Sequence, residues 1–148
     1  MQKKIIEKAI AFARKLEVSA NKNELCFIHG DYNPGNILFT GDIPTGLIDL
    51  DWSRKGLPLE DLAYTLMMFM RDYATKSFRF DEERFLELCS WYGLREADFP
   101  DLKKYLILYA FYDANLFRRL KALPNRELYY SYQKEMLDDF CLRFAEPE

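Results

Sequence analysis

The sequence predicts a mostly helical α+β domain, and three observations support this fold class. Short apolar runs separated by polar turns occupy residues 25–50, whereas apolar residues recur at helical spacing from residue 60 to the end. The ends of the helical segments carry capping residues. The chain has 148 residues, 49% of them hydrophobic and 30% charged, which is sufficient for one hydrophobic core and ordinary for one domain. We therefore expect a single domain, residues 1–148, with a leading helix and loop (1–24), a polar loop and hairpin (25–59) and a helical subdomain (60–148).

Before residue 60, the pattern predicts one helix and then short strands. The helix places apolar side chains on one face and lysines on the other. The two later strands are expected to pair as a hairpin because the residues between them, Gly41–Thr45, have the composition of a turn. In order, the expected elements are a helix (3–18), a loop (20–23), a strand (25–28) and the hairpin strands (37–39 and 46–50).

After residue 60, the pattern predicts four helices. The second has an N-cap at Asp81 and a stop at Gly93. The third contains Tyr105–Tyr112, a stretch that is apolar all round, so we expect this helix to be central and buried. Pro124 then interrupts the pattern, and Asn125 can cap the last helix. The expected helices are approximately residues 60–74, 81–93, 100–122 and 125–144.

Composition and charge exclude several classes of protein. The net charge is −3 and no basic stripe is visible, which disfavours a nucleic-acid partner. The three cysteines are widely spaced without a C-x-x-C pair, which indicates a reducing compartment and argues against a disulfide framework or a zinc site. The longest apolar run has eight residues, and no signal peptide is visible. We expect a cytoplasmic protein with no membrane partner.

One polar loop carries the residues with recognisable chemistry. His29–Asn36 lies between two apolar runs, and Asp31 and Asn36 have the five-residue spacing of the kinase catalytic loop H-x-D-x-x-x-x-N. Asp49 follows thirteen residues after Asn36, at the end of an apolar strand. Phosphoryl transfer needs a group that orients a substrate hydroxyl and hard oxygen ligands for Mg²⁺. Asp31 can supply the first, and Asn36 and Asp49 the second.

Two other interpretations of this loop are weaker. Asn33–Asn36 has strong turn chemistry, so Asp31 and Asn36 on their own could be plain turn residues. A calcium loop fails because its sixth position is Asn36 rather than Gly and its twelfth is Asp42 rather than Glu.

Three linked motifs stand in order along residues 25–63: Phe27–Asp31 with Asn36–Phe39, then Gly46–Asp49, then Gly56 with Asp61–Ala63. In this order and spacing they resemble the aminoglycoside phosphotransferase family, which includes choline kinases and type II homoserine kinases and has a protein-kinase-like fold. The resemblance is specific over these residues and general over the helical tail. It implies a C-terminal lobe in which a short β-hairpin carries the catalytic loop and the metal-binding aspartate.

The resemblance also implies a role for each site residue. It makes Asp31 the catalytic base and Asn36 and Asp49 the magnesium ligands. ATP or GTP would donate its γ-phosphate to a hydroxyl of a small molecule. Asp61 would brace the loop from the start of a helix, and His29 would fix the loop by hydrogen bonds rather than act as an acid or base.

Three further residues are weaker candidates for acceptor binding. Asp51 occupies the place where some family members carry an acidic residue that faces the metal or the substrate. Trp52 either lines the acceptor site or packs as a rim aromatic. Asp113 interrupts the most apolar predicted helix, so it must be paired or face a cleft. We hypothesise that Asp113 binds an amine of the acceptor, and the alternative is a buried hydrogen bond to the region of the catalytic loop.

The chain departs from the family before the loop. Complete members have an N-terminal lobe with a phosphate-covering glycine-rich loop and a lysine. Here only 28 residues precede His29, and no glycine occurs before Gly30. We therefore expect the C-terminal lobe alone, with the N-lobe absent and the activity of the isolated chain left open. Two alternatives remain, a non-catalytic binding or scaffold module of the same fold and one half of a split kinase. The split kinase needs a partner chain that supplies the N-lobe, and it predicts an exposed apolar patch near the strands.

Overall fold

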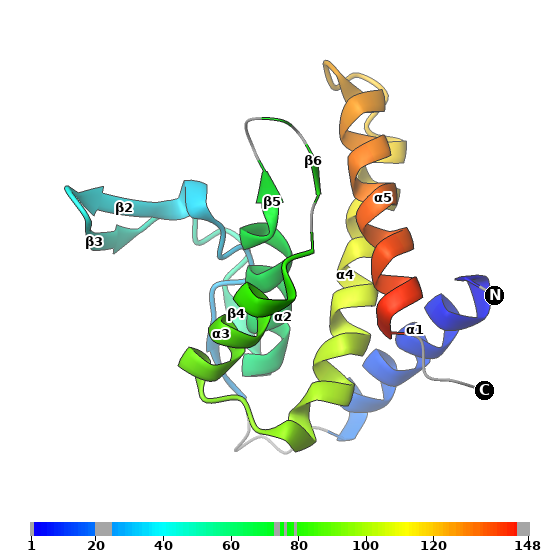
Figure 1. The fold of residues 1–148 in the computed structure, drawn as a ribbon, viewed down its shortest axis with the longest axis horizontal. Coiled ribbons are helices and arrows are strands. Elements are labelled where there is room, and N and C mark those ends of the chain that lie inside the picture. The colour runs from blue at the N-terminus through cyan, green and yellow to red at the C-terminus, as the bar shows by residue number, and fades with distance from the viewer. Residues whose placement is uncertain (1, 20–24, 73–74, 76, 79, 145–148) are drawn as a thin grey trace.

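The helices form the body of the molecule, and a two-stranded hairpin projects from it (Figure 1). The computed structural model describes residues 2–19, 25–72, 75, 77–78 and 80–144. The helices are α1 (Gln2–Ser19), α2 (Pro58–Phe69), α3 (Glu82–Tyr92), α4 (Phe99–Arg119) and α5 (Arg126–Phe144), with short 3₁₀ turns η1 (Pro34–Asn36) and η2 (Glu96–Asp98). The strands are β1 (Cys26–Ile28), β2 (Ile37–Thr40), β3 (Ile43–Leu47), β4 (Arg54–Gly56), β5 (Arg71–Asp72) and β6 (Ser77–Phe78). The predicted mostly helical α+β class is confirmed.

The hydrophobic core lies around α4. This helix packs against α1, α2 and α5, and it runs alongside α5 for most of its length (Figure 1). The fully buried side chains come from α2 (Leu66 and Met67), α4 (Leu102 and Leu106) and α5 (Met136 and Phe140). The prediction that α4 is the central helix is confirmed. The expectation that its middle is buried all round is wrong at Tyr112, which is 70% exposed because one side of the helix faces solvent there.

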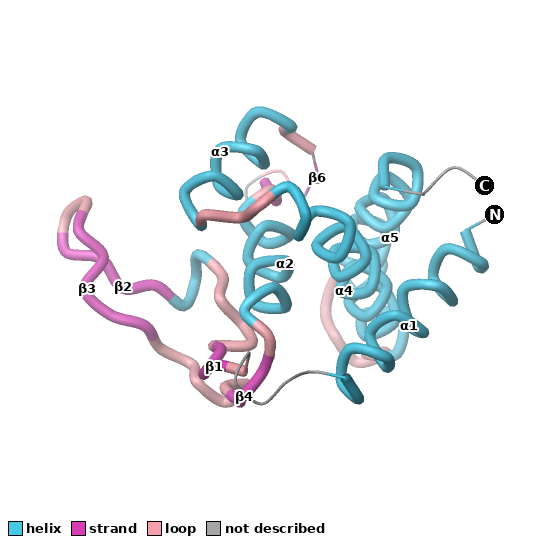
Figure 2. Tube along the Cα trace, turned by 90° about the horizontal axis from the view of Figure 1, so that it is seen from below, coloured by secondary structure: helices cyan, strands magenta, loops and turns pink. Residues whose placement is uncertain are grey.

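The strands pair in three separate two-stranded antiparallel sheets, β1–β4, β2–β3 and β5–β6. The β2–β3 hairpin reaches away from the helices, while β1 and β4 lie near the start of α2 (Figure 2). The sequence predicted the hairpin, but its turn is only Gly41–Asp42 rather than 41–45, and β3 begins at Ile43 rather than at residue 46. Pro44 is compatible with β3 because this strand has a free edge and the register shifts between Leu38 and Phe39.

The sequence did not predict β4. Arg54, Lys55 and Gly56 lack the apolar alternation of a strand, yet they pair with Ile28, Phe27 and Cys26 of β1. A β-carbon on Gly56 would lie 2.4 Å from Cδ1 of Ile28, so a larger residue here would force the Ile28 side chain to shift.

The helix predicted for residues 60–74 begins earlier and ends earlier. Pro58 stands at its first turn, where the fixed φ of proline favours helix entry. The helix ends at Phe69, and Arg71 and Asp72 pair with Phe78 and Ser77 as β5–β6. The prediction of a helix through residue 72 is wrong, and residues 73 and 74 lie outside the described part of the chain.

Most of the remaining helix ends agree with the sequence, but α4 ends at Arg119 rather than near residue 122. The side chain of Asp81 accepts the N–H of Arg84 at 3.0 Å, and Gly93 adopts a left-handed φ of 77° after α3. The last helix ends at Phe144, as predicted. The predicted loop at residues 20–23 lies outside the described residues. No helix in the described part of the chain is both long enough and apolar enough to span a bilayer.

Candidate active site

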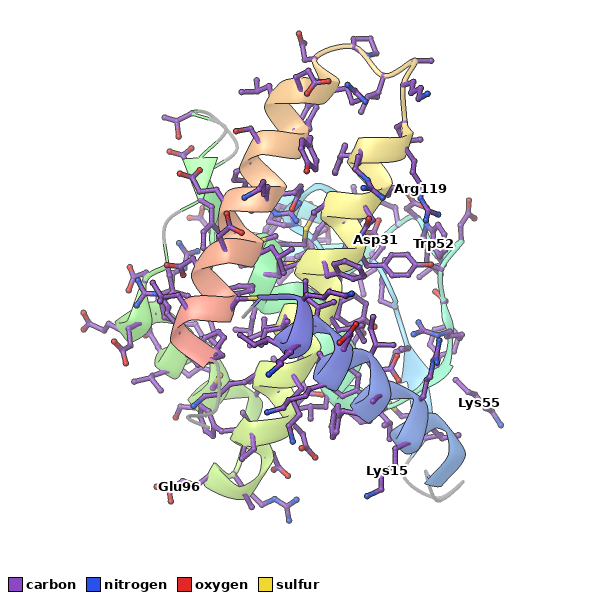
Figure 3. All side chains as sticks on the ribbon, turned by 90° about the vertical axis from the view of Figure 1, so that its right-hand side faces the viewer. Lys15, Asp31, Trp52, Lys55, Glu96 and Arg119 are labelled. Atoms are coloured by element: carbon purple, nitrogen blue, oxygen red, sulfur yellow. The ribbon has the colours of Figure 1, made fainter. Side chains whose placement is uncertain are left out.

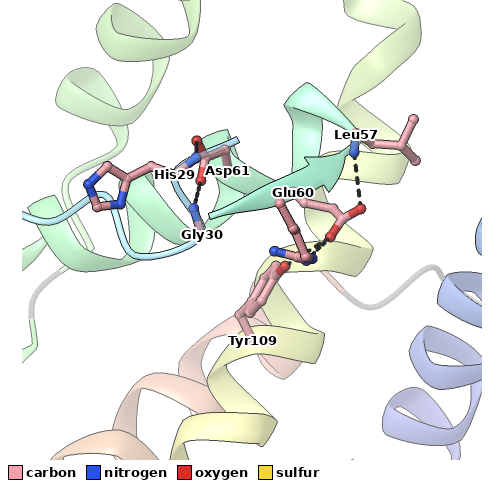
Figure 4. A network of polar contacts seen from close by, with 7 residues as sticks. His29, Gly30, Leu57, Glu60, Asp61 and Tyr109 are labelled. Carbon is pink, nitrogen blue, oxygen red and sulfur yellow. Dashed lines mark hydrogen bonds and ion pairs between the residues drawn. The ribbon is translucent and has the colours of Figure 1, made fainter. Parts of the chain in front are cut away.

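The polar loop between β1 and β2 is attached to the start of α2. The carboxylate of Asp61 accepts the backbone N–H of His29 at Oδ2 (2.9 Å) and that of Gly30 at Oδ1 (2.8 Å), as Figure 4 shows. Tyr32 of the loop stacks on Phe69 near the end of the same helix, with ring centroids 6.3 Å apart. Contacts near both ends of α2 therefore place the loop, including Asp31, along one side of this helix.

A second network beside the first joins β4 to the helices. Glu60, which precedes Asp61, accepts the N–H of Leu57 at 3.2 Å and the hydroxyl of Tyr109 at 3.3 Å, and it pairs with Arg54 (Figure 4). The two consecutive acidic residues thus bind different segments: Asp61 binds the loop, and Glu60 binds β4 and α4.

The loop passes close to the backbone of Trp52. Gly30 has a φ of +79°, and a β-carbon there would lie 2.4 Å from the carbonyl oxygen of Trp52. Both the conformation and the space therefore require glycine. Ser53 donates from Oγ to the carbonyl oxygen of His29 at 3.4 Å, so the segment after Asp49 is held against the loop.

Asp31 receives hydrogen bonds from two side-chain amides of its own loop. Asn33 donates from Nδ2 to Oδ1 of Asp31 (3.1 Å), and Asn36 donates from Nδ2 to Oδ2 (2.9 Å). Both amides also donate to the carbonyl oxygen of Asp31, at 3.2 and 2.9 Å. Each carboxylate oxygen keeps a second lone-pair direction for a further donor, such as a substrate hydroxyl.

His29 connects the loop to the residue before Asp49. Its Nε2 lies 3.1 Å from the carbonyl oxygen of Ile48, and its Nδ1 accepts the N–H of Asp31 at 3.3 Å. Since a carbonyl oxygen only accepts, this arrangement puts the ring proton on Nε2. The N–H of Ile48 donates to the carbonyl oxygen of Asn36 at 3.0 Å. Both backbone groups of Ile48 are therefore held by the loop, and Asp49 follows directly.

Asp49 itself is exposed and has a φ of +60°, the left-handed region that non-glycine residues rarely occupy. A non-glycine residue in this region costs of order 1–3 kcal/mol and is typical of functional sites. The strain is compatible with a carboxylate that a turn directs outward from the end of the hairpin.

The oxygen donors here suit Mg²⁺. Because Nδ2 of Asn36 donates to Asp31, its Oδ1 is the atom left to act as a ligand. The described residues contain no cluster of three His, Cys, Asp or Glu side chains that could hold a metal ion. Mg²⁺ is usually bound by one or two carboxylates together with substrate phosphates and water rather than by a full protein cage. One amide oxygen and the Asp49 carboxylate fit that donor set.

A cluster missed by the sequence analysis lies on the other side of Asp31. Burial raises the pKa of Tyr64 on α2 well above its ordinary range, and the charges of Asp113 and Asp31 raise it further. Burial also raises the pKa of Asp113; Arg71 opposes this shift, and the charge of Asp31 adds to it. Asp31, Tyr64 and Asp113 therefore lie within electrostatic reach of one another. The signal in the sequence is the position of Tyr64, one turn after Asp61 on the same helix.

Asp113 makes its hydrogen bond with Arg71 of β5. Nη2 of Arg71 lies 2.9 Å from Oδ2 of Asp113 and 2.8 Å from Oε1 of Gln133. Within the described residues, the partner of Asp113 is thus an arginine, and the expected alternative of a bond to the catalytic-loop region is wrong. Its role in acceptor binding stays a prediction.

Asp51 and Trp52 both lie on the surface, and the Trp52 side chain is 70% exposed. Figure 3 shows Asp31 near the middle of the view and Lys15 of α1 and Lys55 of β4 in its lower part. Both lysines are exposed.

Comparison with known families gives one match. Residues 2–122, from α1 through α4, match the model of the phosphotransferase enzyme family. The matched part contains every candidate site residue named above. A comparison with curated proteins gives no match.

Proposed function

The chain belongs to the phosphotransferase enzyme family, and on that premise we propose that it transfers the γ-phosphate of ATP or GTP to a hydroxyl of a small molecule with Mg²⁺. The observation that carries the proposal is the anchoring of Asp31. One amide holds each of its carboxylate oxygens, and Asp61 accepts the backbone N–H groups of His29 and Gly30 just before it. Catalysis of phosphoryl transfer consists mainly of positioning and electrostatic stabilisation, so a carboxylate fixed in this way is the feature such a reaction requires.

We assign each residue a part in this reaction. Asp31 orients the acceptor hydroxyl and accepts its proton, while Asn36 and Asp49 are the protein ligands for Mg²⁺. Bound Mg²⁺ supplies charge neutralisation at the phosphates. His29 and Asp61 keep the loop in shape through the hydrogen bonds described above.

The acceptor site in this proposal lies between the loop and α4. In this proposal Asp113 lines the buried side of the acceptor site, next to Asp31. Asp51 and Trp52 line its solvent-exposed side. Oδ2 of Asp113 is already held by Arg71, so an amine of the acceptor would bind through Oδ1. Because Arg71 offsets the charge of Asp113, we expect Asp113 to add only modest selectivity for amines.

The test is phosphate transfer from labelled ATP or GTP to a panel of hydroxyl acceptors that includes aminoglycosides, amino alcohols, amino acids and sugars. Asp31→Asn is nearly isosteric, so it should reduce turnover by a factor on the order of 10² to 10⁴ while the chain stays folded. Its urea midpoint should fall slightly, because one of the two donating amides loses its acceptor. Equal turnover in the variant and the parent chain would remove the assignment of Asp31 as the base.

A second candidate, half of a split kinase, is favoured by one observation. Large apolar side chains are exposed on β1, on the hairpin and on the segment after it. Side chains of this kind are usually buried in a hydrophobic core. They are Phe27, Leu38, Phe39, Ile43, Leu47, Ile48, Leu50 and Trp52, and we call them the strand-region apolar group. Exposed apolar surface of this kind marks interaction sites, and an isolated two-stranded hairpin is only marginally stable.

This candidate predicts that the chain needs a partner polypeptide with a glycine-rich loop and a lysine. The purified chain should then transfer phosphate only after that polypeptide is added, and Ile43→Glu in the strand-region apolar group should prevent the gain. Full activity of the chain as a lone monomer would exclude it.

The non-catalytic scaffold is distinguished by nucleotide binding. A nucleotide present at 100 times its dissociation constant stabilises the folded state by about 2.7 kcal/mol. If ATP and GTP, each with Mg²⁺, leave the thermal midpoint unchanged with and without the partner, the scaffold interpretation is favoured.

A further inference from the structure

The side chain of Asn33 makes two kinds of contact in the polar loop. Its Oδ1 accepts the N–H of Gly35 at 2.8 Å, which caps the 3₁₀ turn η1. Its Nδ2 donates to the carboxylate of Asp31 at 3.1 Å and to the carbonyl oxygen of Asp31 at 3.2 Å. Since the N–H of Gly35 can only donate, the orientation of the Asn33 amide is fixed, and its NH₂ group must face Asp31.

The contact of Asn33 with Asp31 complements that of Asn36. Asn36 donates to Oδ2 of Asp31, and Asn33 donates to Oδ1. One donor on each oxygen fixes the rotation of the carboxylate about its Cβ–Cγ bond, which one donor alone would leave free to turn. Asn36 is also the proposed metal ligand, whereas Asn33 has its carbonyl oxygen committed to the cap.

We infer that Asn33 is a positioning residue that fixes the carboxylate of Asp31 in the orientation in which it accepts the proton of the acceptor hydroxyl. The inference rests on the proposed phosphoryl transfer. Asn33 acts through Asp31 and touches neither the nucleotide nor the acceptor, so its loss lowers the turnover number and leaves nucleotide binding unchanged. The same side chain thus couples the shape of the loop to the orientation of the base.

Cap and positioning roles can be separated because Ser and Asp both cap helical turns well. Asn33→Ser and Asn33→Asp keep an oxygen for the N–H of Gly35 but lack the amide that reaches Asp31. Asn33→Ala removes both contacts. Asp81→Ser, an exchange of one N-cap for another at α3, is the matched control because its capping bond to Arg84 lies outside the loop.

The kinetic measurement is kcat and KM for nucleotide and acceptor in these variants. We expect kcat to fall by about tenfold or more in Asn33→Ser and Asn33→Asp. In Asn33→Ser, KM for the nucleotide should stay within twofold of the parent value, and the urea midpoint should fall by less than in Asn33→Ala. Asn33→Ala should show the same loss of kcat together with a lower midpoint. Retention of parental kcat by both capping variants would overturn the inference and leave Asn33 as a cap only.

A double-mutant cycle tests the contact without any activity. The urea midpoints of Asn33→Ser, Asp31→Ala and the double variant are compared with that of the parent chain. If the two side chains are coupled, the shift of the double variant is smaller than the sum of the single shifts. Additive shifts would overturn the inference even in an inactive chain. If Asn33 and Asp31 are coupled but the chain transfers no phosphate, the proposed function is contradicted, whereas the contact that orients Asp31 is still supported.

Discussion

Arg71 and Asp113 form an ion pair in the interior of the helical body. Nη2 of Arg71 lies 2.9 Å from Oδ2 of Asp113, with the two side chains only 6% and 14% exposed. The same nitrogen donates to the buried side chain of Gln133, and the guanidinium lies 5.5 Å from the centre of the Tyr132 ring. Because a buried charge must be paired, these contacts fix β5 against both α4 and α5.

Breaking this pair from one side should be costly. Arg71→Met leaves the carboxylate of Asp113 buried without its cation, and loss of one partner of a buried pair destabilises by about 3–5 kcal/mol. Urea unfolding measures the effect. Arg95→Met is the matched control, because its pair with Asp98 is exposed and the urea midpoint should hardly change. A similar midpoint for Arg71→Met and the parent chain would show that the pair does not hold β5 in place.

Asp113 should also make stability depend on pH. Burial and the charge of Asp31 raise its pKa above the ordinary value in spite of Arg71. A carboxyl group whose pKa is raised by folding favours the protonated form, so its contribution to stability is present at low pH and is lost as pH rises from about 4 toward the raised value. Asp113→Asn still accepts a hydrogen bond from Arg71 but does not titrate. The difference in unfolding free energy between parent and variant should therefore shift in favour of the variant as pH rises through this window. A constant difference would contradict the prediction.

The sequence predicted those parts of the site that depend on local spacing. The loop from His29 to Asn36 and the aspartate at the end of the hairpin are visible as motifs, because phosphoryl transfer needs particular residue types at fixed separations. Asn33 was recognised only as a turn residue. Its capping role follows from composition, whereas its bond to Asp31 depends on the orientation of a side-chain amide that no pattern encodes.

The parts that the sequence missed depend on tertiary contacts. The strand β4 has the sequence Arg-Lys-Gly and exists because it pairs with β1 and because Arg54 pairs with Glu60. The apolar periodicity of α2 continues past Phe69, but the chain leaves the helix there, and Arg71 reaches Asp113, which is 42 residues away in sequence. Periodicity reports which face of a helix is apolar and does not report such distant partners.

Gly30 should tolerate no side chain. In Gly30→Ala, the left-handed φ and a contact of 2.4 Å with the carbonyl oxygen of Trp52 act together, so either the loop or the Trp52 backbone must shift. Gly41→Ala is the matched control, because its φ is +61° and its β-carbon would meet nothing within 4 Å. We expect a loss of about 1 kcal/mol for Gly41→Ala and a clearly larger loss for Gly30→Ala, measured by urea unfolding. Equal losses would show that the contact with Trp52 relaxes freely.

Tyr64 should support Asp31 from the side of α2. The loop is tied to this helix at Asp61 and stacked on it at Phe69, so Asp31 lies over the turn between them, where Tyr64 stands. The Tyr64 ring packs edge-on against Tyr109 with centroids 5.7 Å apart. Tyr64→Phe keeps this packing and removes only the hydroxyl.

In the phosphate-transfer assay, turnover of Tyr64→Phe should fall by about tenfold, because the variant removes the polar hydroxyl beside Asp31. Tyr109→Phe is the matched control, since its hydroxyl bonds to Glu60 and not to the loop, and its turnover should be unchanged.

Spectrophotometric titration of the tyrosines gives a readout that needs no activity. The pKa of Tyr64 is raised far above the ordinary range by burial and by the charges of Asp113 and Asp31. The parent chain and Tyr64→Phe should therefore show the same tyrosine ionisation up to about pH 11. Loss of one titrating tyrosine in the variant would mean that Tyr64 is not held beside the two carboxylates, and its proposed support of Asp31 would fail with it.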